Sequence, residues 1–236
     1  MGPTLSINKA ESQSESNVNL SSRVLTRSKK GTIFLFDWDD TLMCTSFISL
    51  KSFPLSEEEE KIVCNLGKKV SCFLQKCSEY GKIIIMTNSS KEWMEETGIN
   101  FLKLDESIFR NITIISTRDI FSNKKIDKKR WKEIAFQKLL LKLGDEVENI
   151  ICASDSERDI DLFKKKSKNQ KGINIATIKF KAKPSPLVMI KEIDYLNKNI
   201  YRIIGANKHY FLVKEKENTD SFNFSFGYLL DYIFTN

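Results

Sequence analysis

The sequence predicts an α/β fold: a doubly wound, Rossmann-like open parallel sheet of about five core strands, with helices on both faces and no large cap domain. Short β-branched runs alternate with longer amphipathic runs along most of the 236 residues. Parallel neighbouring strands need a crossover connection, usually a helix, so this alternation indicates a sheet covered on both faces. With 41% hydrophobic residues, the chain can build one core of about 200 residues.

The expected catalytic domain spans residues 32–206. Residues 1–31 are rich in Ser and Asn, lack aromatic residues and show no apolar period, which predicts a disordered polar and basic tail. Residues 207–236 are rich in aromatic residues, so we expect an extension that packs on the domain.

The expected strands are apolar, β-branched runs and the expected helices have a period of three to four residues. The strands are Thr32–Phe36, Ile83–Met86, Ile112–Ile115, Asn149–Ala153 and Ile173–Ile178. The helices follow Ser56, begin near Ser89 or Ser90, and span Arg130–Leu143, Glu157–Lys166 and Ser185–Ile204. Ser56 and Glu59 have capping-box spacing, as do Ser89 and Glu92, and Gly81 is a stop signal.

The amino-acid composition argues against several classes of catalytic site and against a membrane span. Five cysteines form no CxxC pair, and His209 is the single histidine, which disfavours a zinc site and a histidine-based triad. No run approaches the roughly 18 apolar residues of a membrane span, so we expect a soluble, cytoplasmic protein, with a nuclear location left open.

Lysine runs carry most of the net charge of +7, chiefly in residues 124–132 and 163–184. A basic surface attracts phosphorylated partners, nucleic acid or acidic headgroups. Aromatic residues do not interleave with these lysines as they do in single-strand grooves, so a solvated surface is favoured over nucleic-acid binding.

Three carboxylates, Asp37, Asp39 and Asp40, follow the first strand at once. They stand at the carboxyl edge of the sheet, where α/β folds bind ligands. Alternation along an extended turn predicts that Asp37 and Asp39 point the same way, and two converging carboxylates need a cation. Oxygen ligands without His or Cys favour Mg²⁺. We expect Asp40 to be a solvent-facing turn residue.

Polar residues also follow the second and fourth predicted strands, at the same edge of the sheet. Thr87 and Asn88 follow the second strand and suit a phosphate oxygen, while Asp155 and Asp159 follow the fourth. Lys132 begins the helix before that fourth strand. Carboxylates, a hydroxyl and a cation at successive strand ends indicate phosphoryl transfer.

Four segments, FDWDDTL, MTNSS, WKEIAF and ASDSERD, resemble in this order the motifs of the haloacid dehalogenase superfamily. Its phosphatases carry a DxDx(T/V) motif, a Thr or Ser at the second strand end, a Lys, and an acidic motif resembling GDxxxD. The chain has Ser154 where Gly is usual. Several lysines compete for the third motif, and we prefer Lys132 for its place at the helix start; the others are Lys124, Lys125, Lys128, Lys129 and Lys138.

The resemblance implies a role for each matched residue. Asp37 would be the nucleophile that forms an aspartyl-phosphate, and Asp39 the general acid and base. Mg²⁺ would be held by the Asp37 carboxylate, the Asp39 backbone carbonyl and Asp155. Phosphate oxygens would be bound by Thr87, Lys132 and the Asn88 N–H, while Thr41 braces the first loop and Asp159 supports the metal site.

The two places where family members insert a cap, around residues 43–53 and 117–129, are too short for a folded domain. By family analogy a capless site suits a bulky phosphorylated substrate, such as a phosphoprotein or a nucleic-acid end.

Two alternatives stay open: a non-catalytic interaction protein with a basic surface, and a phosphotransferase. The sequence does not indicate an oligomeric state. Trp38 either lines the mouth of the site or packs within the fold. Cys44 and Cys152 are expected to have structural roles.

Overall fold

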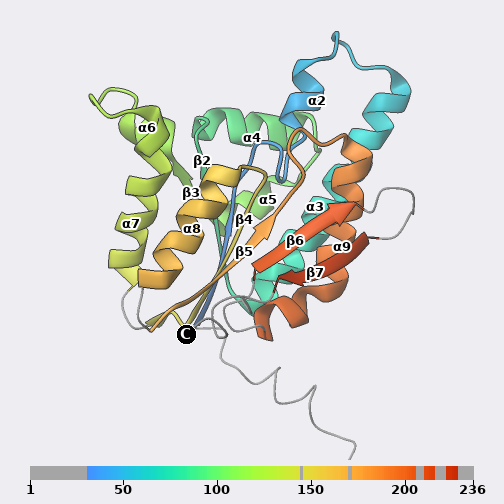
Figure 1. Cartoon of the computed structure of the whole chain (residues 1–236). Coiled ribbons are helices and arrows are strands. Elements are labelled where there is room, and N and C mark those ends of the chain that lie inside the picture. The colour runs from blue at the N-terminus through green and yellow to red at the C-terminus, as the bar shows by residue number, and fades with distance from the viewer. Residues whose placement is uncertain (1–30, 144–145, 170–171, 206–209, 216–221, 228–236) are drawn as a thin grey trace, which may run out of the picture.

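The sheet positions every element of the site. The computed structural model describes residues 31–143, 146–169, 172–205, 210–215 and 222–227. Within these residues one sheet has seven strands in the order β3-β2-β1-β4-β5-β6-β7 (Figure 1). The strands are β1 (Thr32–Phe36), β2 (Lys82–Thr87), β3 (Ile112–Ser116), β4 (Asn149–Ser154), β5 (Asn174–Lys179), β6 (Tyr210–Glu215) and β7 (Phe222–Gly227).

The first five strands are mutually parallel, which confirms the predicted fold class. Strand β6 pairs in parallel with β5, and β7 runs antiparallel to β6. Part of the region expected as a packed extension therefore lengthens the sheet. Residues 1–30 of the predicted tail (1–31) and His209 lie outside the described residues.

The side chains of β1 alternate between two cores, as the pleat of a strand requires. Phe34 and Phe36 are buried in the core that includes residues of α3 (Glu57–Tyr80), α4 (Lys91–Asn100) and α9 (Pro186–Gly205). Ile33 and Leu35 are buried in the opposite core. Helices α6 (Thr117–Phe121), α7 (Trp131–Leu143) and α8 (Glu157–Asn169) cover that second face (Figure 1).

Helix α3 has the boundaries that its sequence predicts. Ser56 Oγ accepts a hydrogen bond from Glu59 N at 3.3 Å, and Glu59 Oε2 accepts one from Ser56 N at 3.0 Å. The capping box is thus complete, and four glutamates in the first turn complement the helix dipole. Gly81 ends the helix and donates its N–H to Cys77 O at 3.1 Å.

The predicted capping box of α4 is wrong. Ser90, not Ser89, is the N-cap, and its hydroxyl accepts a hydrogen bond from Trp93 N at 3.2 Å. Residue spacing alone does not separate two adjacent serines, and the Ser89 hydroxyl has a different partner, in the site.

Both possible cap positions hold only short elements. The first contains α2 (Thr45–Ser49), and the second contains α6 and the 3₁₀ helix η2 (Lys128–Arg130). With α5 (Glu106–Arg110), these elements are too short to produce a periodic signal, and the sequence did not predict them. The predicted absence of a cap domain is confirmed for the described residues. None of the helices described is long and apolar enough to cross a membrane.

Candidate active site

Strand order brings the separate motifs together. Strand β1 lies between β2 and β4, so Asp37 follows the central strand while Thr87 and Ser154 end its two neighbours. Asp37 N donates to Ala153 O at 2.9 Å, which extends the β1–β4 pairing to the nucleophile candidate. The order of the strands along the chain reverses between β1 and β4, the switch point where open α/β sheets bind ligands.

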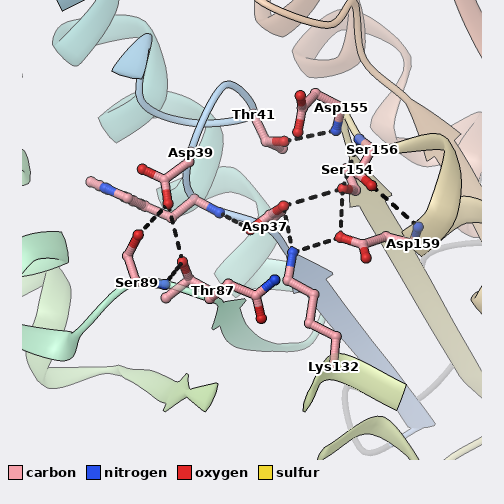
Figure 2. A network of polar contacts seen from close by, with 12 residues as sticks. Asp37, Asp39, Thr41, Thr87, Ser89, Lys132, Ser154, Asp155, Ser156 and Asp159 are labelled. Atoms are coloured by element: carbon pink, nitrogen blue, oxygen red, sulfur yellow. Dashed lines mark hydrogen bonds and ion pairs between the residues drawn. The ribbon is translucent and has the colours of Figure 1, made fainter. Parts of the chain in front are cut away.

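Lys132 joins two buried carboxylates. Its Nζ donates to Asp37 Oδ2 and to Asp159 Oδ2, each at 2.5 Å (Figure 2). All three side chains are at most 10% exposed. The preferred third-motif lysine is therefore the one that reaches Asp37. Asp159 was predicted to support the metal site. In the structure its carboxylate instead accepts a hydrogen bond from Lys132.

Burial and the neighbouring charges shift the pKa values of this ion pair in opposite directions. Burial raises the pKa of Asp37 to about 6, although the nearby Lys132 ammonium acts to lower it. Burial acts to lower the pKa of Lys132, but the charges of Asp37 and Asp159 outweigh it and the net shift is upward. Lys132 is therefore a fixed cation at neutral pH, and Asp37 gives up its proton only above its usual range.

The Ser154 hydroxyl bridges the same two carboxylates. It lies 3.2 Å from Asp37 Oδ2 and 3.1 Å from Asp159 Oδ2, and it accepts a hydrogen bond from Ser156 N at 3.1 Å. The side chain is fully buried. A glycine at this position, usual in the resembling superfamily, has no such group. Ser154 thus adds a hydroxyl beside the Asp37 oxygen that already contacts Lys132.

Asp155 lies on the other side of Asp37 from the lysine's helix, next to the first loop (Figure 2). Its N–H donates to Thr41 Oγ1 at 3.0 Å, so Thr41 ties this strand end to the first-motif loop. Burial, together with the charges of Asp37 and Asp40, raises the pKa of Asp155 to about 7. The carboxylates here carry more negative charge than Lys132 neutralises, an environment that favours a bound cation.

Asp39 has its own set of partners. Its Oδ1 accepts from Thr45 Oγ1 at 2.7 Å and Trp93 Nε1 at 3.3 Å. Its Oδ2 accepts from Ser89 Oγ at 2.7 Å and Thr87 Oγ1 at 3.3 Å. The expectation that Asp37 and Asp39 point the same way is therefore wrong, because Figure 2 shows their carboxylates directed apart. Ser89 and Trp93 were missed as site residues.

The prediction that Asp40 faces solvent is wrong. It is 8% exposed, has a φ of 52°, and accepts hydrogen bonds from Ser46 N at 2.8 Å and from Ser46 Oγ. Asp tolerates this left-handed conformation better than most residues, which allows the chain to turn back toward α2. The carboxylate fixes the loop that carries Asp39, and no local sequence pattern shows this.

The remaining candidates differ in their surroundings. Trp38 is fully buried and donates Nε1 to Thr97 Oγ1 at 3.0 Å, so of its two predicted roles the structure shows packing. Asn88 Oδ1 accepts from Thr117 Oγ1 at 2.6 Å, which orients the turn after β2. Burial raises the pKa of Cys44 to about 12 and raises that of Cys152, so both thiols are protonated, consistent with structural roles.

Comparison with known proteins identifies the family. The model of the NLI interacting factor-like phosphatase family matches residues 32–198, well over half of the chain. The chain belongs to this family. It is a capless phosphatase family of the haloacid dehalogenase superfamily, so the resemblance drawn from the four motifs is confirmed. No curated protein and no solved structure matches the chain.

The match extends from β1 into α9 and includes every site residue described above. Membership implies a phosphatase of the haloacid dehalogenase type acting on a phosphorylated substrate. The family does not by itself assign the reaction's residues in this chain. Those assignments depend on the geometry.

Proposed function

We propose that the chain is a Mg²⁺-dependent phosphohydrolase that cleaves phosphoric monoesters through an aspartyl-phosphate on Asp37. The observation that carries the proposal is the position of Asp37 at the switch point, with Lys132 Nζ at 2.5 Å. A buried carboxylate beside a fixed cation suits a nucleophile that must approach an anionic phosphoryl group.

The donor set fits Mg²⁺. The proposed ligands are the carboxylates of Asp37 and Asp155 and the backbone carbonyl of Asp39. No three His, Cys, Asp or Glu side chains in the described part of the chain converge as a metal site, so the set depends on a backbone oxygen. Mg²⁺ keeps several waters and needs few protein carboxylates, which agrees with this sparse set. When bound, the ion neutralises charge on the phosphoryl oxygens.

The two steps of the reaction then divide among these residues. The Asp37 carboxylate attacks phosphorus, the bond to the leaving oxygen breaks, and Asp39 supplies that oxygen with a proton. Water next attacks the phosphorus of the aspartyl-phosphate while Asp39 takes its proton, which releases phosphate and restores Asp37. Lys132, the Thr87 hydroxyl and the Asn88 N–H orient the phosphoryl oxygens, and we place the leaving group on the side of Asp39.

The test is phosphate release from an aryl phosphate with and without Mg²⁺, in the parent and in Asp37→Asn. We expect activity in the parent with the ion and a loss of at least about a thousandfold in the variant, since removal of a nucleophile abolishes the covalent route. An inactive parent at every divalent ion tested would favour the non-catalytic alternative. Transfer to an added alcohol faster than to water would favour the phosphotransferase. Equal activity in Asp37→Asn refutes the nucleophile.

A further inference from the structure

A group of cations stands beside the site without a role in the chemistry above. Residues 122–130 connect α6 to α7, and we call residues 124–130 the basic turn. Five of its side chains are cationic and exposed, namely Lys124, Lys125, Lys128, Lys129 and Arg130, and the last three form η2. The turn ends two residues before Lys132, whose ammonium contacts Asp37.

The charge of the basic turn is not neutralised within the described residues. Arg130 has a distant ion pair with Glu133 at 4.0 Å, and the Asp127 carboxylate caps η2 by accepting from Lys129 N at 2.9 Å. No carboxylate of the described residues forms an ion pair with the ammonium groups of Lys125, Lys128 or Lys129. These ammonium groups therefore face solvent as free binding charges.

The basic turn is close along the chain to Lys132, whose Nζ contacts Asp37. Lys129 precedes Lys132 by three residues, so their Cα atoms are at most about 11 Å apart. This separation exceeds the Debye length of about 8 Å at physiological salt but is well within the roughly 30 Å at 0.01 M salt, so the field of the turn acts on the site chiefly at low salt. The site itself is rich in carboxylates, and cations at its rim would draw an anionic substrate toward it.

A small phosphate ester would fill only the site and would not touch the turn. A longer substrate would reach it, since an extended peptide advances about 3.3 Å per residue and covers 11 Å in about three residues. The aromatic residues that flank the turn, Phe121 and Trp131, are 1% and 8% exposed. Residues 122–130 contain no aromatic side chain, so a nucleic-acid strand finds no stacking surface.

We infer that the basic turn binds acidic side chains or further phosphates within about three residues of the phosphorylated residue of a protein substrate. The turn is thereby a specificity surface for an acidic phosphoprotein segment. This inference rests on the proposed phosphatase function, because it places the scissile phosphate at Asp37.

Helix α8 provides a matched control. The helix starts at Glu157, two residues after Asp155, and its lysines Lys165 and Lys168 are exposed in its second half. Figure 1 shows the course of α8. Lys168 lies about 16 Å along the axis from that start. The variants Lys128→Glu/Lys129→Glu and Lys165→Glu/Lys168→Glu change the net charge equally, but only the first pair changes it beside the site.

The experiment compares kcat/KM for two phosphopeptides that differ only in Glu or Gln at the three positions on each side of the phosphoserine. We expect the parent and the α8 variant to prefer the Glu peptide by about tenfold at low salt, the effect of two exposed charge pairs. The turn variant should lose or reverse this preference through KM. Its activity on an aryl phosphate should stay within about twofold of the parent, because the turn does not touch a small substrate.

Three results would overturn the inference: no preference in the parent, equal loss in both variants, or a turn-dependent preference for a phosphorylated oligonucleotide over the Glu peptide. A parent inactive on all substrates would contradict the proposed function instead. The turn is then judged by fluorescence anisotropy of the labelled Glu phosphopeptide on Asp37→Asn protein. Weaker binding after Lys128→Glu/Lys129→Glu, but not after the α8 change, supports the turn, and unchanged binding refutes it.

Discussion

Replacing Lys132 by Met should destabilise the fold in a way that depends on pH. The change removes the ammonium 2.5 Å from both Asp37 and Asp159 and leaves two buried carboxylates without their cation. Breaking a buried ion pair by removing one partner costs about 3–5 kcal/mol. In a domain of this size such a loss lowers Tm by roughly 10 °C.

The pH dependence follows from the direction of the Asp37 shift. Burial raises its pKa to about 6, above the value of about 3.9 in an unfolded chain. The folded state therefore binds this proton more tightly, and the free energy of unfolding falls as pH rises through that window. Loss of the ammonium that lowers this pKa extends the window toward neutral pH. The cost of Lys132→Met should be largest near pH 8 and smallest near pH 5.

Urea unfolding in EDTA, at several pH values, measures this effect without a contribution from bound metal. Lys142→Met is the matched control, because Lys142 is exposed in the last turn of the same helix and its loss should change stability by less than about 0.5 kcal/mol. A cost below about 1 kcal/mol for Lys132→Met at pH 8, or a cost that does not vary with pH, would refute the buried bridge between the two carboxylates.

Three further predictions concern packing, the bridging hydroxyl and the metal. Gly67→Ala should cost at least about 2 kcal/mol in urea unfolding, because the new Cβ would lie 1.7 Å from Leu102 O. Ser154→Ala should lower kcat about five- to tenfold and move the acid limb of the pH–rate profile upward, since Asp37 loses a hydrogen-bond donor to its charged form; an unchanged profile would contradict this role. Mg²⁺ at about a hundred times its Kd should stabilise the parent by about 2.7 kcal/mol, and Asp155→Asn should remove most of that gain; equal gains in both proteins would exclude Asp155 as a ligand.

Residues whose role depends on local spacing could be predicted. The capping box of Ser56 and Glu59 requires only two positions in one helical turn, and it is present as expected. Strands β1 to β5 were predicted because each is an apolar run, and parallel pairing then places their polar ends at one edge. Lys132 could be preferred over its neighbours because it begins the helix that leads into β4.

Residues whose role depends on contacts across the sheet could not be predicted. Ser89 and Trp93 reach Asp39 from about 50 residues away in the chain, and nothing near them indicates which adjacent serine would cap α4. Asp40 resembles a surface turn residue until its left-handed backbone and Ser46 are known. One signal was available for Ser154: it stands where the motif usually has Gly, and a departure inside a motif marks a place to expect a new contact.

The position of β1 inside the sheet, between β2 and β4, has a consequence for synthesis. Asp37 leaves the ribosome more than 110 residues before Ser154, whose strand supplies the hydrogen-bond acceptor Ala153 O that holds Asp37 N. A nascent or truncated chain that ends before β4 leaves β1 as an exposed edge and lacks Asp155 and Asp159. We therefore expect neither the folded sheet nor the proposed phosphatase activity until β4 and the residues that follow it have been made.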